Sequence, residues 1–182
     1  IDRFTIRNLE LFSSNGANAK CSFADVIDRT LTAMGGRQLK RWIAMPLMDI
    51  EKIRLRQDIV EKFTLDFDLA DAMREQIATV GDLERIASRI ATQRVTPREM
   101  VQLSVALNCI APIKHICENA EDNGYLRLLG EQLSLCSEIC QRIQHDITPD
   151  PPAVQGRPNT IARGVNTELD ELRDIQANGK EH

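Results

Sequence analysis

The sequence has few aromatic residues and no surplus of basic charge. Phe, Trp and Tyr make up 4% of its 182 residues, whereas all-β sandwiches and barrels usually contain more of them. The net charge is −4 at pH 7, and a protein that coats DNA or RNA by itself is normally basic. These two shortages argue against an all-β domain and against an autonomous nucleic-acid-coating protein. A local basic patch is still compatible with them.

The chain also lacks the cysteine pattern of a disulfide framework. Its five cysteines are an odd number, and no pair has the Cys-x-x-Cys spacing. This usage favours a reducing, cytoplasmic compartment. Cys136 and Cys140 are one helical turn apart, but a metal site would need two further ligands. We therefore interpret these cysteines as small core residues.

No signal peptide and no uninterrupted apolar run of bilayer-spanning length is evident, so we expect no membrane partner. The chain begins with Ile and ends at "NGKEH" without an obvious finish. We therefore expect an excised piece of a longer protein.

Apolar residues at helical spacing run through most of the chain. Ser22 is a candidate N-cap for a helix that starts at Phe23. The segment Thr96-Pro97-Arg98-Glu99 combines an N-cap, a proline at N1 and a capping box. The stripe over residues 129–147 advances in steps of four and three, which predicts one long helix. The fold class predicted is mainly α, a multihelical antiparallel bundle that divides, in one version, into two helical subdomains.

Short strands are expected only near residues 4–12 and 160–165, where β-branched residues occur. Residues 13–22 are rich in turn-forming types and predict a loop. The Pro/Gly-rich stretch "ITPDPPAVQGRPN" predicts a boundary. We expect a helical domain over residues 1–148, and a connection with the start of a further helix over 149–182.

Gly35 and Gly36, followed by Arg37 and Arg41, raise the question of a phosphate-binding loop. Their spacing fits neither Walker A nor GxGxxG, and no buried strand precedes them. We interpret the stretch as a helix–glycine–helix joint, with Trp42 in the core and both arginines paired to acids on neighbouring segments. No histidine lies beside a candidate nucleophile, so no local motif predicts an enzyme.

Four blocks follow one another along the chain: "DRFTIRNLELF", "VIDRTLTAMGGRQLKRWIAMPLMD", "GDLERIASRIA" with "TPREMVQL", and "GVNTELDELR". In this order and spacing they resemble the core (lever) domain of the MutS family of DNA mismatch-repair ATPases. The first is similar to the family's entry segment, and the fourth to the start of its long lever helix. The second and fourth blocks are most similar to the bacterial mismatch-repair branch.

The resemblance implies a structural and allosteric segment that links a DNA clamp to an ATPase domain. Family members bind mismatched DNA with an N-terminal Phe-x-Glu wedge and hydrolyse ATP, with Mg, in a C-terminal Walker-type domain. Neither motif occurs in this sequence, so we expect no enzymatic activity, cofactor or metal in this segment. For the full-length protein the resemblance implies binding to mismatched duplex DNA, to a second copy of itself and to a MutL-type repair partner, in the cytoplasm.

The matching blocks also imply positions with an interdomain or structural role. They are Arg7, Asn8, Asp28, Gly35, Arg37, Arg41, Trp42, Asp82, Glu84, Arg85, Arg89 and Glu168. The alternative is an all-α module that itself binds the duplex DNA backbone through exposed arginines at 37, 41, 85 and 89. Without the returning half of the family's core, one apolar face would lack a partner, either that of Leu169, Leu172 and Ile175 or the stripe over residues 129–147. We then expect self-association or fraying at the C-terminal end.

Overall fold

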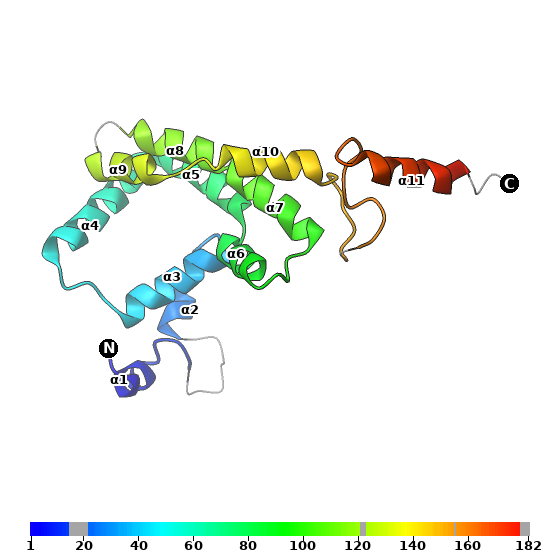
Figure 1. Ribbon diagram of the computed structural model, residues 1–182. Coiled ribbons are helices and arrows are strands. Elements are labelled where there is room, and N and C mark those ends of the chain that lie inside the picture. The colour runs from blue at the N-terminus through cyan, green and yellow to red at the C-terminus, as the bar shows by residue number, and fades with distance from the viewer. Residues whose placement is uncertain (15–21, 121–122, 155, 179–182) are drawn as a thin grey trace. The chain divides into compact units, whose positions relative to one another are not determined.

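The protein is mainly α-helical, as the sequence predicts (Figure 1). A computed structural model describes residues 1–14, 22–120, 123–154 and 156–178; most of the loop expected over 13–22 lies outside them. The chain divides into two compact units, Ile1–Glu84 with Cys109–Ser134, and Arg85–Asn108 with Leu135–His182. Neither unit is continuous in sequence. The expected boundary between 1–148 and 149–182 stays a prediction.

The first unit is built around helices that pack on one another in sequence-distant pairs. Its helices are α1 (Arg3–Asn8), α2 (Phe23–Ile27), α3 (Ala33–Ala44), α4 (Ile50–Leu65), α5 (Phe67–Val80), α8 (Ile110–Glu118) and α9 (Gly124–Gln132). Helix α8 packs against α5 and α9, and α4 packs against α5 and α9. Met73, Cys117, Ala120 and Leu126 form the buried cluster of this unit. Burial of these apolar side chains is the main favourable term in its stability.

Helices α8 and α9 approach each other very closely at Gly130. A Cβ atom at this position would lie 2.8 Å from the Cβ atom of Cys117 and 3.3 Å from the backbone N of Glu118. Neither atom belongs to the flexible end of a side chain, so only glycine fits without a shift of the helices. The absence of a side chain at Gly130 therefore sets the distance between these two helices.

The first residues of the chain form helix α1 and not the short strand expected near residues 4–12. Asp2 is the N-cap: its Oδ1 accepts from the Thr5 backbone N–H at 2.8 Å, and its Oδ2 accepts from the Thr5 hydroxyl at 2.9 Å. Both hydrogen bonds lower the pKa of Asp2. The cap satisfies backbone donors that a strand would have left to a partner strand, and this local gain outweighs the weak β preference of Thr5 and Ile6.

The helix–glycine–helix joint lies slightly earlier in the chain than expected. Helix α3 already begins at Ala33, because the Thr32 side chain caps it by accepting from the Gly35 N–H at 3.1 Å. Both glycines therefore lie in the first turn of α3. A Cβ atom at Gly35 would lie 3.3 Å from the Thr30 Cβ. The glycines let residues 28–32 pack closely on the start of the helix.

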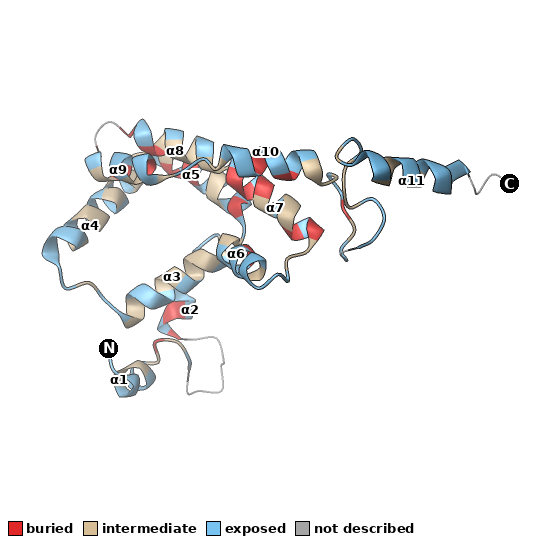
Figure 2. Cartoon of the chain, viewed as in Figure 1, coloured by how far each residue is buried: buried red, intermediate tan, exposed pale blue. Residues whose placement is uncertain are grey.

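The second unit contains most of α6 (Leu83–Ala91), α7 (Pro97–Asn108), α10 (Ser137–Asp146) and α11 (Thr167–Asn178). Helices α7 and α10 pack on each other, and Figure 2 shows buried residues on both. Cys140 is buried there, and its thiol donates to the Asn108 Oδ1 at 3.0 Å. The interpretation of Cys140 as a core residue is confirmed.

The long helix expected over residues 129–147 is interrupted. Helix α9 ends at Gln132, and α10 begins at Ser137. Cys136 precedes α10 in the left-handed region with φ 49° and ψ 35°. Cys136 and Cys140 are therefore not two residues on one face of a continuous helix. Apolar periodicity continues across the break, so the sequence pattern alone does not reveal it.

Between α10 and α11, Ile147 and Ile161 form an isolated antiparallel bridge, where a short strand near 160–165 was expected. Helix α11 then begins at Thr167, with the Asn166 side chain accepting from the Leu169 N–H at 3.0 Å. Among its described residues none is buried, and Leu172 and Ile175 are exposed.

Among the described residues, one helical stretch, Pro97–Glu118, is long and apolar enough to span a bilayer by length and composition alone. From the sequence, no uninterrupted apolar run of this length was expected. Soluble core helices meet the same criteria, so this stretch is weak evidence for a membrane span. It contains the buried carboxylate of Glu99, which two arginines neutralise as described below.

Candidate functional site

Arg37 of α3 binds two carboxylates that lie 45 and 47 residues later in the sequence. Its guanidinium donates to Asp82 with two nitrogens, at 3.0 and 2.6 Å, and to the Glu84 Oε2 with Nε at 2.8 Å and Nη2 at 2.6 Å. The Arg37 side chain is half exposed, and that of Asp82 is mostly covered. A planar guanidinium forms such forked contacts and an ammonium group does not. The contact fastens α3 to the start of α6, with Asp82 just before this helix and Glu84 in its first turn.

The local sequence after α5 positions the carboxylates of Asp82 and Glu84 within reach of Arg37. Gly81 is the C-cap of helix α5, and its φ of 71° with ψ of −145° is accessible to glycine and strained for other residues. This sharp turn brings Asp82 and Glu84 to the start of α6. The two carboxylates raise the pKa of Arg37, with hydrogen bonds to Asp82 as the largest cause. Arg37 therefore stays charged and bound to acids of its own unit.

Glu99 is the centre of a second ionic cluster, within the second unit. Its carboxylate is buried, and its Oε1 lies 3.0 Å from Arg89 Nη1 and 3.8 Å from Arg85 Nη2. Its Oε2 accepts from the Thr96 N–H at 2.9 Å and from the Thr96 hydroxyl at 3.0 Å. The capping box predicted at Thr96 is thus present, and the same carboxylate also joins α6 to α7.

The surroundings of Glu99 lower the pKa of its carboxyl group. The backbone N–H of Thr96 contributes most, and Arg89 and Arg85 add smaller contributions, while burial acts in the opposite direction. Hydrogen bonds to a carboxylate favour its ionised form. Arg89 also donates to the Arg94 backbone carbonyl at 3.2 and 2.9 Å. Most of the hydrogen-bonding capacity of Arg89 is therefore used inside the domain.

Trp42 does not lie in a core, in contrast to the expectation from the sequence. Its side chain is 44% exposed, and the guanidinium carbon of Arg56 lies 3.8 Å from the centroid of its ring. The geometry is that of a cation–π contact between α3 and α4. The neighbouring Arg41 donates to Gln38 on its own helix at 3.4 Å. The expected pairing of Arg41 with an acid of another segment is therefore not among its described contacts.

The remaining positions singled out from the sequence lie at the ends of helices. Arg7 and Asn8 are exposed in the last turn of α1. Glu168 is exposed in the first turn of α11, where a negative charge interacts favourably with the helix dipole. Asp28 precedes α3 and accepts from the Thr30 N–H at 3.0 Å and from its hydroxyl at 2.7 Å. These hydrogen bonds lower the pKa of Asp28. The twelve positions are divided between the two units: Arg85, Arg89 and Glu168 belong to the second, and the other nine to the first.

Glu99 and Arg56 take part in these contacts but were not singled out from the sequence as site residues. Glu99 was recognised as half of a capping box, but its pairing with Arg85 and Arg89 depends on how α6 meets α7. Arg56 carried no signal of its own, because a lone arginine on an exposed helix is usual. Spacing of Arg85 and Arg89 by one turn was the only available hint that they share a partner.

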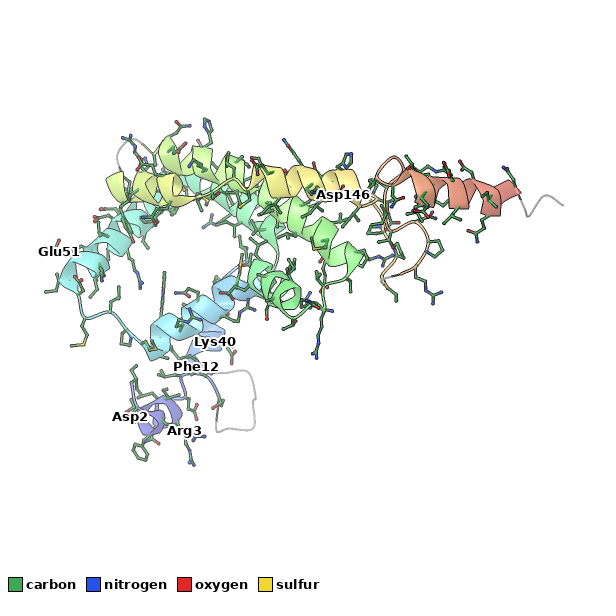
Figure 3. All side chains as sticks on the ribbon, in the orientation of Figure 1. Asp2, Arg3, Phe12, Lys40, Glu51 and Asp146 are labelled. Atoms are coloured by element: carbon green, nitrogen blue, oxygen red, sulfur yellow. The ribbon has the colours of Figure 1, made fainter. Side chains whose placement is uncertain are left out.

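Charged side chains are distributed over the helices, from Arg3 on α1 and Lys40 on α3 to Glu51 on α4 and Asp146 on α10 (Figure 3). Among the described residues, no group of three or more His, Cys, Asp or Glu side chains is arranged to hold a metal ion. The arginines that could attract DNA phosphate at 37, 85 and 89 each face a carboxylate. The described part of the molecule is therefore a helical domain whose ionic clusters join its own segments.

Comparison with known proteins identifies the family to which this helical domain belongs. The family model described as MutS domain III matches residues 4–181. The chain is 48% identical over 182 residues to the DNA mismatch repair protein MutS of Phocaeicola vulgatus, and 47% identical over the same length to that of Bacteroides thetaiotaomicron. In both comparisons all of this chain is covered, but only 21% of the relative. The chain belongs to the MutS domain III family and spans about a fifth of the length of these relatives.

Proposed function

We propose that this domain is a structural and allosteric core segment, or lever, of a DNA mismatch-repair protein. It links a DNA-binding clamp to an ATPase domain and relays the nucleotide state between them, without catalysing a reaction itself. The full-length protein binds mismatched duplex DNA, and ATP with Mg²⁺ in a separate domain. It acts in the cytoplasm as a dimer, together with a MutL-type repair partner.

The family match and the Arg37 contact support this proposal. An element that couples distant sites works through rigid segments and salt-bridge networks with discrete arrangements, and it must hold its segments together within each arrangement. Arg37 does this with four hydrogen bonds to Asp82 and Glu84, which are far from it in sequence. Arginines that are neutralised in this way are better suited to stabilising the domain than to binding DNA.

The proposal is tested with the full-length protein that carries this domain. We expect Arg37→Gln to slow DNA-stimulated nucleotide exchange by at least about fivefold, the lower end of usual allosteric couplings. Affinity for mismatched DNA should be nearly unchanged, because Arg37 supports the coupling and not the DNA contact. Stopped-flow measurement of nucleotide release and equilibrium DNA binding give the two quantities.

Arg74→Gln is the matched control. Arg74 pairs with Asp71 at 2.8 Å, but both belong to α5, so this variant loses the same charge without separating segments. It should leave exchange and DNA affinity as they are. Equal loss of both quantities in Arg37→Gln, or slowed exchange in Arg74→Gln as well, would contradict the proposed role.

The alternative of direct binding to the DNA backbone leads to a different result. If Arg37 contacted a phosphate, Arg37→Gln would reduce the slope of log affinity against log salt by about one unit. Because its guanidinium is bound to two carboxylates, we expect no change in this slope from about 50 mM salt upward. A reduced slope would favour the DNA-binding alternative.

A further inference from the structure

The interruption between α9 and α10 is not encoded by a helix breaker. Residues 131–147 contain neither glycine nor proline, and all types present there are compatible with a helix interior. In an unbroken helix, Leu129, Leu133, Cys136, Cys140 and Ile143 would share one face, since they advance in steps of four and three. The local sequence is therefore suited to a continuous helix that the structure does not form.

Cys136 shows the strain of this interruption. It adopts φ 49° and ψ 35°, a left-handed conformation that is uncommon for a residue with a Cβ atom and usual for glycine. In an unbroken helix Cys136 would have ordinary helical angles. Local backbone preference at this position thus favours the continuous helix, so other contacts must hold the break.

Lys114 of α8 provides one such contact within the first unit. Its Nζ donates to the Leu133 carbonyl at 3.1 Å and is 3.5 Å from the Glu131 carbonyl. It also lies 3.5 Å from the Glu118 carboxylate. In an unbroken helix the same two carbonyls would accept from the N–H groups of Leu135 and Ser137. Lys114 therefore occupies acceptors that the continuous helix would use.

We propose that residues 133–136 are a conformational switch. In one state α9 and α10 are separate, and Lys114 donates to the Leu133 carbonyl at the end of α9 and lies close to the Glu131 carbonyl. In the other state residues 124–146 form a single helix and Lys114 is released from these carbonyls. The break lies where the chain passes from the first unit to the second, between residues 134 and 135. The segment that links the two units, residues 133–136, is thus non-helical in one state and helical in the other.

Hydrogen exchange in the full-length protein tests the switch, because the N–H groups of residues 137–139 lack intrahelical acceptors in the separate state and gain them in the continuous one. Cys136→Ala favours the continuous helix, and Cys136→Gly favours the left-handed break. We expect exchange over residues 133–139 to be at least about tenfold slower in Cys136→Ala than in Cys136→Gly. Lys114→Met should slow exchange there, and its control Lys52→Met, which loses an exposed pair with Asp49, should not.

A distance measurement checks the same variants. Spin labels at the exposed positions 127 and 141 should show a population with a backbone separation of about 21 Å, the length of fourteen helical residues, and this population should grow in Cys136→Ala and shrink in Cys136→Gly. Equal exchange over 133–139 in the two Cys136 variants, together with one unchanged distance distribution, would overturn the proposal. If Lys114→Met speeds exchange throughout 110–132, it reports lost packing, and the Cys136 pair decides.

Discussion

Arg37 and Asp82 form a forked ion pair across 45 residues of sequence, with two guanidinium nitrogens on the two oxygens of one carboxylate. We expect Arg37→Lys to lower the thermal stability of the protein, because an ammonium group cannot reproduce the fork or reach Glu84 at the same time. The Arg37 side chain is half exposed, so salt should weaken the effect. Thermal unfolding at low and high salt checks this: the wild-type and Arg37→Lys curves should converge at high salt, and a salt-independent difference would contradict it.

Gly130→Ala should destabilise the first unit by about 1–3 kcal/mol, although alanine is the better helix former. The added Cβ would meet the Cβ of Cys117 at 2.8 Å, and such overpacking usually outweighs the gain in helix propensity. Gly124→Ala in the same helix is the control, because a Cβ there has no neighbour within 4 Å. Denaturant unfolding should show Gly124→Ala equal to or slightly more stable than wild type. Equal effects of both variants would show that the close approach of α8 and α9 carries no free energy.

Arg56→Leu should change the emission of Trp42, which is the single tryptophan in the chain. Removal of the cation 3.8 Å from the ring centroid changes the electric field at the indole. It should destabilise the protein by about 0.5–1 kcal/mol. Fluorescence spectra and urea unfolding monitored by the same tryptophan give both quantities. Arg54→Leu, one turn from the start of α4 and paired with Glu51, should leave the spectrum as it is.

Glu99 should make stability depend on acid pH. Because its pKa is lowered in the folded state, its contribution is complete above the unfolded pKa of about 4.3 and is lost as pH falls through the folded value. Glu99→Gln should reduce the free energy of unfolding by about 1–3 kcal/mol at pH 7, where a charge-assisted hydrogen-bond network is lost. The difference between wild type and variant should shrink below pH of about 4. A constant difference from pH 7 to pH 3 would contradict the role of the ionised carboxylate.

The exposed stripe of α11 should promote self-association of this 182-residue chain. Leu172 and Ile175 are 58% and 68% exposed, and exposed apolar stripes favour association. Light scattering should therefore show a mass that rises with concentration, and the double substitution Leu172→Ser with Ile175→Ser should suppress the rise. A monodisperse monomer in the wild-type chain, with strong amide protection through 167–177, would exclude both association and fraying.

Local signals account for the parts of the fold that the sequence determined by itself. Ser22, Asp49 and Thr96 cap helices where their side chains reach the next N–H groups, and Asp66 does the same for α5. Such capping depends on three or four adjacent residues only, so it can be identified without knowing the fold. The blocks that resemble the MutS core were likewise sufficient to indicate the family.

Only the tertiary structure decided which residues meet across the chain. The break at 133–136 lies in a sequence with uninterrupted helical periodicity, and Trp42 is exposed although its type and spacing suggested burial. The partners of Arg37 and the second role of Glu99 depend on where α6 lies in the folded chain. Periodicity and capping describe a helix by itself. Burial, ion pairing and a strained helix end depend on neighbours tens of residues away, and no local pattern encodes those neighbours.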